Sequence, residues 1–570
     1  MSPRGLLFRH FLRQLASFEA TSTGGEAKYV IIAVVSLVAG PGYIAALAAA
    51  RGSPTIEYTH SGIMPPELWL WKQEWLLLAV SLVAVAALVA IQWRSFVLGG
   101  RDYRILGLLP VPRCTVMSAK LQSVVAVVLL LHLAINTLPG IWLPVASPFG
   151  YLRAAFALQA ALLLQTVFAC AAIVALQGFV VLALPAGAAR RVSLALQTGI
   201  LLALALLFVA EGSISRLAFA MRDSAHPVNW IVPVVWFRAL YVELLGVDSA
   251  ALAAQARLAL FATAAAVAAA VPCSLLGFRD GGAGEEGHRY GGGLTSWPLG
   301  ARLTAGEGRP VVRAVSSFVA KALLRSPSAG FIARGLFVVG VALTVSGFAG
   351  VALRDLGYDA PVLPARPLHA PAFVLPFFAL VGLRLSAVYP SSLGANWIFR
   401  LTETPGSPDY AAGIRRAARD TVVLPLLVLL AIPYAVYWGP VAAAAHLLLA
   451  LAVSLVTIEW LFLGFPKIPF TCTYQPGKAN LRVTWPRHAA VFVLYCGVVP
   501  SLAARVEARP ATYVVSLCVL LVAWRWLARL RERQAREGRL VFDDAAAPPL
   551  TVLGLEWRAA ADRKAETDLA

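Results

Sequence analysis

The stretch Trp75-Leu-Leu-Leu-Ala-Val-Ser-Leu-Val-Ala-Val-Ala-Ala-Leu-Val-Ala-Ile-Gln-Trp93 decides the fold class of this chain. It holds 19 consecutive residues without a charged side chain. A helix of this length is about 28 Å long and matches the hydrocarbon core of a bilayer, which is about 30 Å thick. The stretch therefore predicts a transmembrane helix with a tryptophan at each end.

The composition of the whole chain extends this prediction. Of its 570 residues, 59% are hydrophobic and 14% are charged, against about 25% charged in a typical soluble protein. The mean hydropathy is +0.75. A water-soluble core could not hide so much apolar surface. The composition excludes soluble, disordered and fibrous classes and predicts an all-α, polytopic integral membrane protein.

Apolar runs of about 17 residues or more predict about 12 transmembrane helices. The runs are Tyr29–Ala50, Trp75–Trp93, Leu121–Leu138, Ala154–Leu184, Leu194–Ala210, Ala253–Phe278, Phe331–Leu353, Ala372–Tyr389, Thr421–Trp438, Val441–Leu463, Ala489–Ala504 and Ala511–Leu527.

These runs form two sets of six, separated by a long polar stretch rich in glycine. We expect an amphipathic interfacial helix in residues 1–28, six-helix membrane units over 29–278 and 331–527, a flexible cytoplasmic linker over 279–330, and a basic cytoplasmic tail over 528–570. The interfacial helix rests on Phe8, Phe11 and Leu15, which share one helical face. The alternative for that helix is a simple topology anchor.

The distribution of basic residues predicts the orientation. The net charge is +19. With a cytoplasmic N-terminus, the segments predicted to lie inside carry 34 of the 48 lysines and arginines, so both termini are expected in the cytoplasm. Because no nucleic-acid-binding motif accompanies this charge, the expected partners are anionic membrane lipids rather than nucleic acid.

The inner loop between the second and third predicted spans has the pattern of a short, stiff helix. Asp102 can cap a helix that runs through Leu109, and Pro110 and Pro112 stop it. Such a helix suits docking against another protein. The alternative is a loop helix that lies on the membrane surface.

This loop also resembles a known family. The stretch Arg101-Asp102…Leu106-Gly107-Leu108-Leu109-Pro110-Val111-Pro112-Arg113…Val116…Ala119-Lys120 is similar to the first cytoplasmic loop of bacterial ABC exporter permeases, the six-span type whose ATPase is a separate chain. The amphipathic helix before the first span, the long outer segment Glu211–Asp248 and the stretch Leu323-Leu-Arg325-Ser326-Pro327 fit the same family.

The resemblance implies the membrane subunit of an ATP-driven exporter in the bacterial inner membrane, with an ABC ATPase as partner. In that family the loop helix couples ATP hydrolysis to the spans, so Arg101, Asp102 and Arg104 would sit at the contact. Trp397 and Arg400 in the second half correspond to them by position only. The chain departs from the family because twelve spans are fused and the second half has only a short outer connection.

Enzyme signatures are absent from the sequence. The nearest approach to a Walker loop, Cys472–Ala479, lacks the first glycine and the hydroxyl for magnesium. We therefore expect no enzyme activity of the chain's own and no cofactor or metal. Two alternative functions stay open: a membrane-embedded enzyme of lipid or cell-wall assembly, and an ion-driven secondary transporter, which would need buried carboxylates at mid-membrane.

Four polar residues within the predicted spans are candidate functional residues, because polar groups are costly in a bilayer. Gln159 and Gln177 lie 18 residues apart on one helical face and either line a path or bond neighbouring helices. Arg384 and Glu459 lie at a similar depth near the inner boundary. They can form an ion pair if their spans are neighbours; the alternative is that each reaches the headgroups separately.

Overall fold

The structure is a computed structural model of the chain. It describes residues 3–16, 66–96, 110–147, 149–220, 227–247, 249–280, 309–325, 327–355, 366–387, 407–465, 467–471 and 481–537, together with the isolated positions 106, 108 and 401. All regular secondary structure in these residues is helical, which confirms the predicted all-α class.

The chain divides into two compact units. Unit 1 comprises Met1–Gly293, Val338–Ala370 and Pro476–Ser501, and unit 2 comprises Leu294–Phe337, Pro371–Gln475 and Leu502–Ala570. Helices α15 (Pro327–Asp355) and α21 (Leu481–Glu507) each contribute residues to both units.

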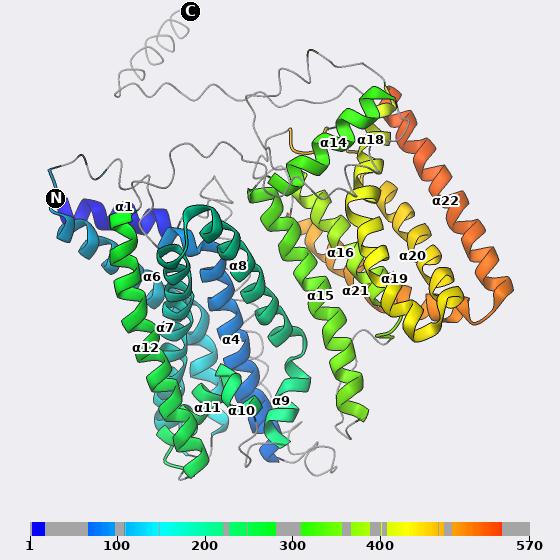
Figure 1. The fold of residues 1–570 in the computed structure, drawn as a ribbon. Helices are drawn as coiled ribbons and strands as arrows, with labels where there is room; N and C mark the ends of the chain where they lie inside the picture. The colour runs from blue at the N-terminus through cyan, green and yellow to red at the C-terminus, as the bar shows by residue number, and fades with distance from the viewer. Residues whose placement is uncertain are drawn as a thin grey trace, which may run out of the picture. The chain divides into compact units, whose positions relative to one another are not determined.

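Unit 1 is a bundle of long helices around α7 (Figure 1). Its other elements are α1 (Pro3–Ala16), α4 (Pro66–Phe96), α6 (Arg113–Trp142), η1 (Leu143–Ala146), α8 (Ala186–Val209), α9 (Glu211–Ala220), α10 (Pro227–Ile231), α11 (Pro233–Leu244) and α12 (Ala250–Asp280). Helix α7 (Tyr151–Ala183) packs against α4, α6 and α12. Trp75, Trp93 and Phe237 are fully buried in the core.

The segment between α8 and α12, predicted as a long outer connection, folds into the three short helices α9, α10 and α11. Helix α11 packs against α4, α7 and α12 and buries Val234, Val235 and Phe237. Pro233 begins α11, where its fixed φ suits the first helical turn and its missing N–H costs nothing. This connection is therefore part of the unit 1 core.

Unit 2 contains α14 (Pro310–Arg325), α16 (Pro371–Ser386), α18 (Asp409–Ala418), η3 (Arg419–Val423), α19 (Leu424–Trp438), α20 (Pro440–Leu461) and α22 (Pro510–Glu537). Helix α20 packs against α16, α19 and α22. Helices α18 and α19 form one continuous span, because η3 is a π-helical turn that joins them without a break.

Nine helices in the described residues are long and apolar enough to cross a membrane, so the chain is a multi-pass membrane protein. They do not reproduce all twelve predicted spans. The predicted span Tyr29–Ala50 lies outside the described residues. The run Ala372–Tyr389 becomes α16, which has only 16 residues. The run Ala489–Ala504 lies within the longer helix α21, which also carries charged residues such as Arg487 and Arg505 and is not among the nine.

Two helices cross or fill the predicted domain segments. Within the predicted linker 279–330, Pro310–Arg325 form α14. Val312, Val315, Val319 and Ala322 recur at helical spacing, and the last three are buried. The predicted tail 528–570 begins inside α22, which continues to Glu537. The rest of the tail lies outside the described residues.

Candidate functional site

The residues predicted to contact an ATPase lie outside the described part of the chain. These are Arg101, Asp102, Arg104, Trp397 and Arg400. The structure instead describes the helices that flank their two loops. In each unit, an amphipathic helix packs against the helix that follows the loop.

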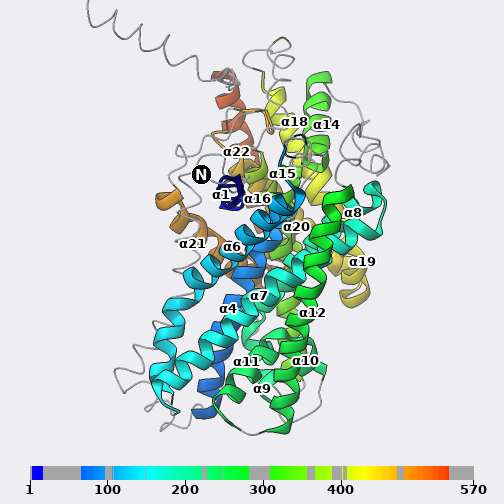
Figure 2. The same cartoon turned by 90° about the vertical axis from the view of Figure 1, so that its left-hand side faces the viewer.

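In unit 1, α1 lies across the first turns of α6. Figure 1 shows α1 running across the long helices, and Figure 2 views it nearly end-on. Phe11 is fully buried against Val116 and Ala119 of α6. The ammonium of Lys120 lies 4.9 Å from the centre of the Phe11 ring, and Arg4 Nε donates to Gln122 Oε1 at 3.3 Å. The loop that holds the predicted docking residues thus leads into a helix braced from outside the bundle.

In unit 2, α14 packs against α18 in a similar way. Gly413 of α18 permits the close approach, because a Cβ there would lie 2.7 Å from Cβ of Val315. Arg309 donates from Nη1 to Asp409 Oδ1 at 2.7 Å, just ahead of α14. This hydrogen bond and the charge of Asp409 raise the pKa of Arg309. The ion pair itself is worth little, because Arg309 is mostly exposed.

Glu459 is the centre of a buried charge cluster in unit 2. Its side chain is fully buried in α20. Arg415 of α18 donates to Glu459 Oε1, and Arg531 of α22 binds Glu459 Oε2 with Nη1 at 3.1 Å. Three helices are therefore joined through one carboxylate. Two guanidinium groups compensate the cost of burying its charge.

Arg384 and Glu459 do not form the ion pair that was one of two alternatives for them, although both residues belong to unit 2. Arg384 Nε donates to the backbone oxygen of Leu461 at 2.9 Å, and the guanidinium lies 4.4 Å from the ring centre of Phe465. The two residues do lie in neighbouring helices, α16 and α20. Arg415 and Arg531 bind the Glu459 carboxylate instead. The depth of each residue within its apolar run does not reveal these partners.

A second buried carboxylate lies in the π-helical turn. Asp420 is 4% exposed. Its Oδ1 accepts from Arg419 Nε at 2.7 Å, and its Oδ2 lies 3.4 Å from Arg416 Nε. The arginines at this end of α18 thus neutralise the carboxylates buried beside them.

Gln159 joins a buried polar network in unit 1. Its Nε2 donates to the backbone oxygen of Asn136 at 3.1 Å. The Asn136 side chain accepts from Ser81 at 2.6 Å and donates to Thr166 at 3.3 Å. The network connects α4, α6 and α7, so Gln159 bonds neighbouring helices, the commoner of its two predicted roles.

Gln177 does not belong to this network as the structure describes it. It is 7% exposed, and its Oε1 has no hydrogen-bonding partner among the described residues. The next residue, Gly178, lies at a close contact between α7 and α12. The structure therefore gives the two glutamines different surroundings.

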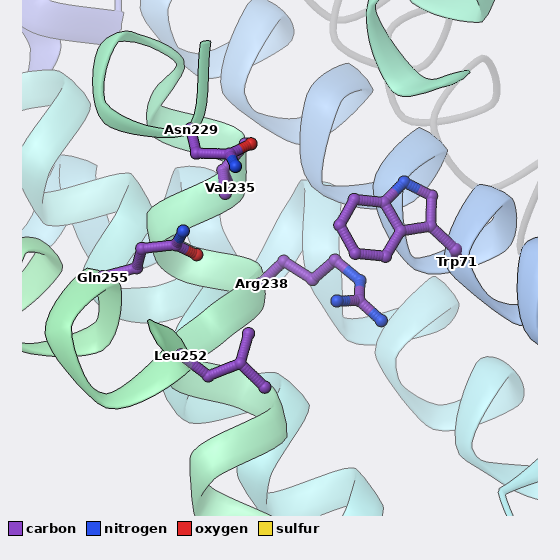
Figure 3. Close-up of a pocket in the computed structure, with 6 residues that line it drawn as sticks. All are labelled: Trp71, Asn229, Val235, Arg238, Leu252 and Gln255. Atoms are coloured by element: carbon purple, nitrogen blue, oxygen red, sulfur yellow. The ribbon is translucent and has the colours of Figure 1, made fainter. Parts of the chain in front are cut away.

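A site that the sequence patterns do not reveal is built around Arg238 in unit 1 (Figure 3). Arg238 of α11 binds Glu74 Oε2 with Nη2 at 2.8 Å, and its guanidinium carbon lies 3.8 Å from the ring centre of Trp71. The surrounding pocket, also lined by Asn229 and Gln255, has a volume of about 10 Å³. This is room for about one water molecule, not for a substrate. The only available signal was a lone arginine in a largely apolar segment.

No family model, no curated protein and no solved structure matches this chain.

Proposed function

We propose that this chain is the membrane-spanning permease subunit of an ATP-driven ABC-type exporter, with its ATPase on a separate polypeptide. The chain lies in the bacterial inner membrane with both termini in the cytoplasm. It has twelve spans in two sets of six: the nine apolar helices, the shorter α16, the more polar α21 and the segment Tyr29–Ala50. A 16-residue helix can span a locally thinned bilayer.

The observation that carries this proposal is that the two units use the same arrangement of helices. In unit 1, the hub α7 packs against α4, α6 and α12, and α1 braces α6. In unit 2, the hub α20 packs against α16, α19 and α22, and α14 braces α18. The elements occur in the same order along the chain in both units. This fits a fusion of two six-span subunits that elsewhere pair as a dimer.

The braced helix gives each unit a means of receiving force from outside the membrane. The loops that hold Arg101 and Trp397 precede the helices braced by α1 and α14. A partner that pushes on such a loop would act on a helix with buried contacts on two sides. The Arg238 pocket has room for about one water molecule, which is too little for a substrate.

The described carboxylates give less support to an ion-driven transporter. Glu459 and Asp420 are the two carboxylates buried in the described part of unit 2, and each is bound by two arginines. A carboxylate that carries a coupling ion must exchange partners during transport. Burial beside two arginines favours a fixed ion pair.

The coupling test replaces Arg101, Asp102 and Arg104 with alanine in the tagged full-length chain. We expect normal amounts of folded protein and a loss of ATP hydrolysis in the purified complex, because the contact to the ATPase is removed. The matched control replaces Arg216, Arg222 and Asp223 with alanine. It removes the same residue types from the segment predicted to lie outside.

The measurements are copurification of an ATPase subunit and the ATP hydrolysis rate per complex in vesicles. The control variant should match the wild-type chain in both. If no ATPase copurifies with the wild-type chain, the proposed function is wrong. If the triple variant hydrolyses ATP as the control does, the assignment of the coupling residues is wrong.

A further inference from the structure

Helix α22 carries four exposed arginines on one face. Arg525, Arg529, Arg533 and Arg536 are all exposed and follow one another by four, four and three residues. This spacing places them in one stripe along the helix, about 16 Å long. The opposite face holds the buried Arg531, the partner of Glu459.

The same face of α22 is apolar in the first half of the helix. Val514 and Leu521 precede Arg525 by eleven and four residues, and they are 58% and 49% exposed. Val515 and Val522, at 61% and 69% exposed, lie on this side as well. A span that exposes valine and leucine in this way faces lipid tails. One continuous face therefore changes from apolar to basic along the helix.

Two tryptophans mark the point of change. Trp526 is 64% exposed, and the guanidinium of Arg525 lies 5.3 Å from the ring centre of Trp524. Tryptophan concentrates where the bilayer core gives way to the headgroup layer. The arginines that follow are thus placed at the level of the headgroups and just beyond them.

We propose that this arginine stripe binds the headgroups of anionic phospholipids in the leaflet that surrounds the basic end of α22. Guanidinium groups form bidentate hydrogen bonds with phosphate oxygens, and the negative surface of the leaflet adds attraction. Two acidic residues lie nearby. Glu532 faces Arg415 at 3.6 Å, and Glu537 follows Arg533 by four residues at the end of the helix, so the four arginines still leave the stripe with a net positive charge. Lipid is the occupant because the stripe continues a lipid-facing surface without a break.

The test uses the full-length chain in vesicles of phosphatidylcholine with a minor fraction of phosphatidylglycerol. Electron paramagnetic resonance of spin-labelled phosphatidylglycerol and phosphatidylcholine gives the relative association constant of the two lipids. The test variant carries Arg525→Gln, Arg529→Gln, Arg533→Gln and Arg536→Gln. We expect the preference for phosphatidylglycerol to fall by at least about fivefold, which equals one arginine's contribution of about 1 kcal/mol.

Two further variants separate lipid binding from a folding defect. Replacing the same four residues with lysine keeps the charge and should keep most of the preference. Replacing Arg505 and Arg509, which lie before α22 at its other end, with glutamine should leave the preference unchanged. The wild-type preference should also weaken as salt is added.

The proposal is overturned if the wild-type chain shows no preference for phosphatidylglycerol, or if the glutamine variant keeps it. The second result would mean that the preference arises elsewhere on the chain. Neither outcome depends on whether an ATPase binds the chain.

Discussion

At the scale of single residues, Glu459 concentrates the electrostatics of unit 2. A carboxylate with no exposed surface is stable only if its charge is compensated nearby. Arg415 and Arg531 provide that compensation from α18 and α22. Burying such a triad adds little net stability, because all three charged groups must leave water. Its contacts join α18, α20 and α22 through one carboxylate.

Glu459→Gln is expected to lower the free energy of unfolding by about 3–5 kcal/mol, because the buried Arg531 and the partly buried Arg415 lose their counter-charge. Arg384→Gln should cost about 1 kcal/mol, since it removes a hydrogen bond to a backbone oxygen. Thermal unfolding of the full-length chain in mild detergent, followed by tryptophan fluorescence, compares the two. Exchanging the charges, with Arg384→Glu and Glu459→Arg together, should not rescue stability. A rescue would mean that these two residues interact directly.

The sequence predicts how deep Arg384 and Glu459 lie in the membrane, but it does not predict which residues they contact. Arg384 and Glu459 sit near the ends of adjacent helices, as their positions in the apolar runs indicated. Arg531 lay beyond the predicted last span, because the apolar run stops at Leu527 while the helix continues to Glu537. The choice of partner depends on helix rotation, and apolar periodicity is too weak in these helices to determine it.

At the scale of helices, the contact between α7 and α12 depends on a missing side chain. A Cβ at Gly178 would lie 2.5 Å from Cβ of Cys273, which is closer than real Cβ atoms approach. Small residues allow such close packing between membrane helices. By contrast, a Cβ at Gly199 in α8 would meet no atom within 4 Å.

These two glycines make a matched pair of alanine substitutions. Gly178→Ala should destabilise the chain by about 1–3 kcal/mol, because the methyl group forces α7 and α12 apart. Gly199→Ala should be neutral or should stabilise by up to about 1 kcal/mol, since alanine favours the helix. The melting temperatures of the two variants in the same detergent give the comparison. Equal shifts would show that the close contact at Gly178 does not limit stability.

The helix predictions succeeded where an apolar run was long and failed where it was mixed or short. Helix α14 was not predicted, because the glycine-rich residues before it indicate a flexible linker over 279–330. The helical folding of the segment between α8 and α12 was missed because α9, α10 and α11 are too short for a clear period. The position of these short helices depends on contacts with α4, α7 and α12. Those contacts join residues far apart in the sequence, so the sequence alone does not predict them.

At the scale of the whole molecule, charge asymmetry predicts which ends of the helices face the cytoplasm. Reporter fusions after Gly99, Gly291 and Arg536 should therefore score as cytoplasmic, and a fusion at Pro227 should score as external. Paired alkaline phosphatase and fluorescent protein fusions measure this, with each reporter serving as the control for the other. A cytoplasmic score at Pro227 would contradict the arrangement of two sets of six spans.

The π-helical turn η3 has a consequence for how this chain can change in length. A π turn holds one residue more than an α turn, and such turns occur as single bulges within α-helices. Losing one codon within Arg419–Val423 would leave an ordinary α-helix, with α18 and α19 still presenting their present faces. Deleting one residue about one turn further along, within α19, would rotate α18 by about 100° relative to the rest of the span. This rotation would move Arg415 away from Glu459. Within this span, a one-residue deletion can therefore be accommodated at the bulge.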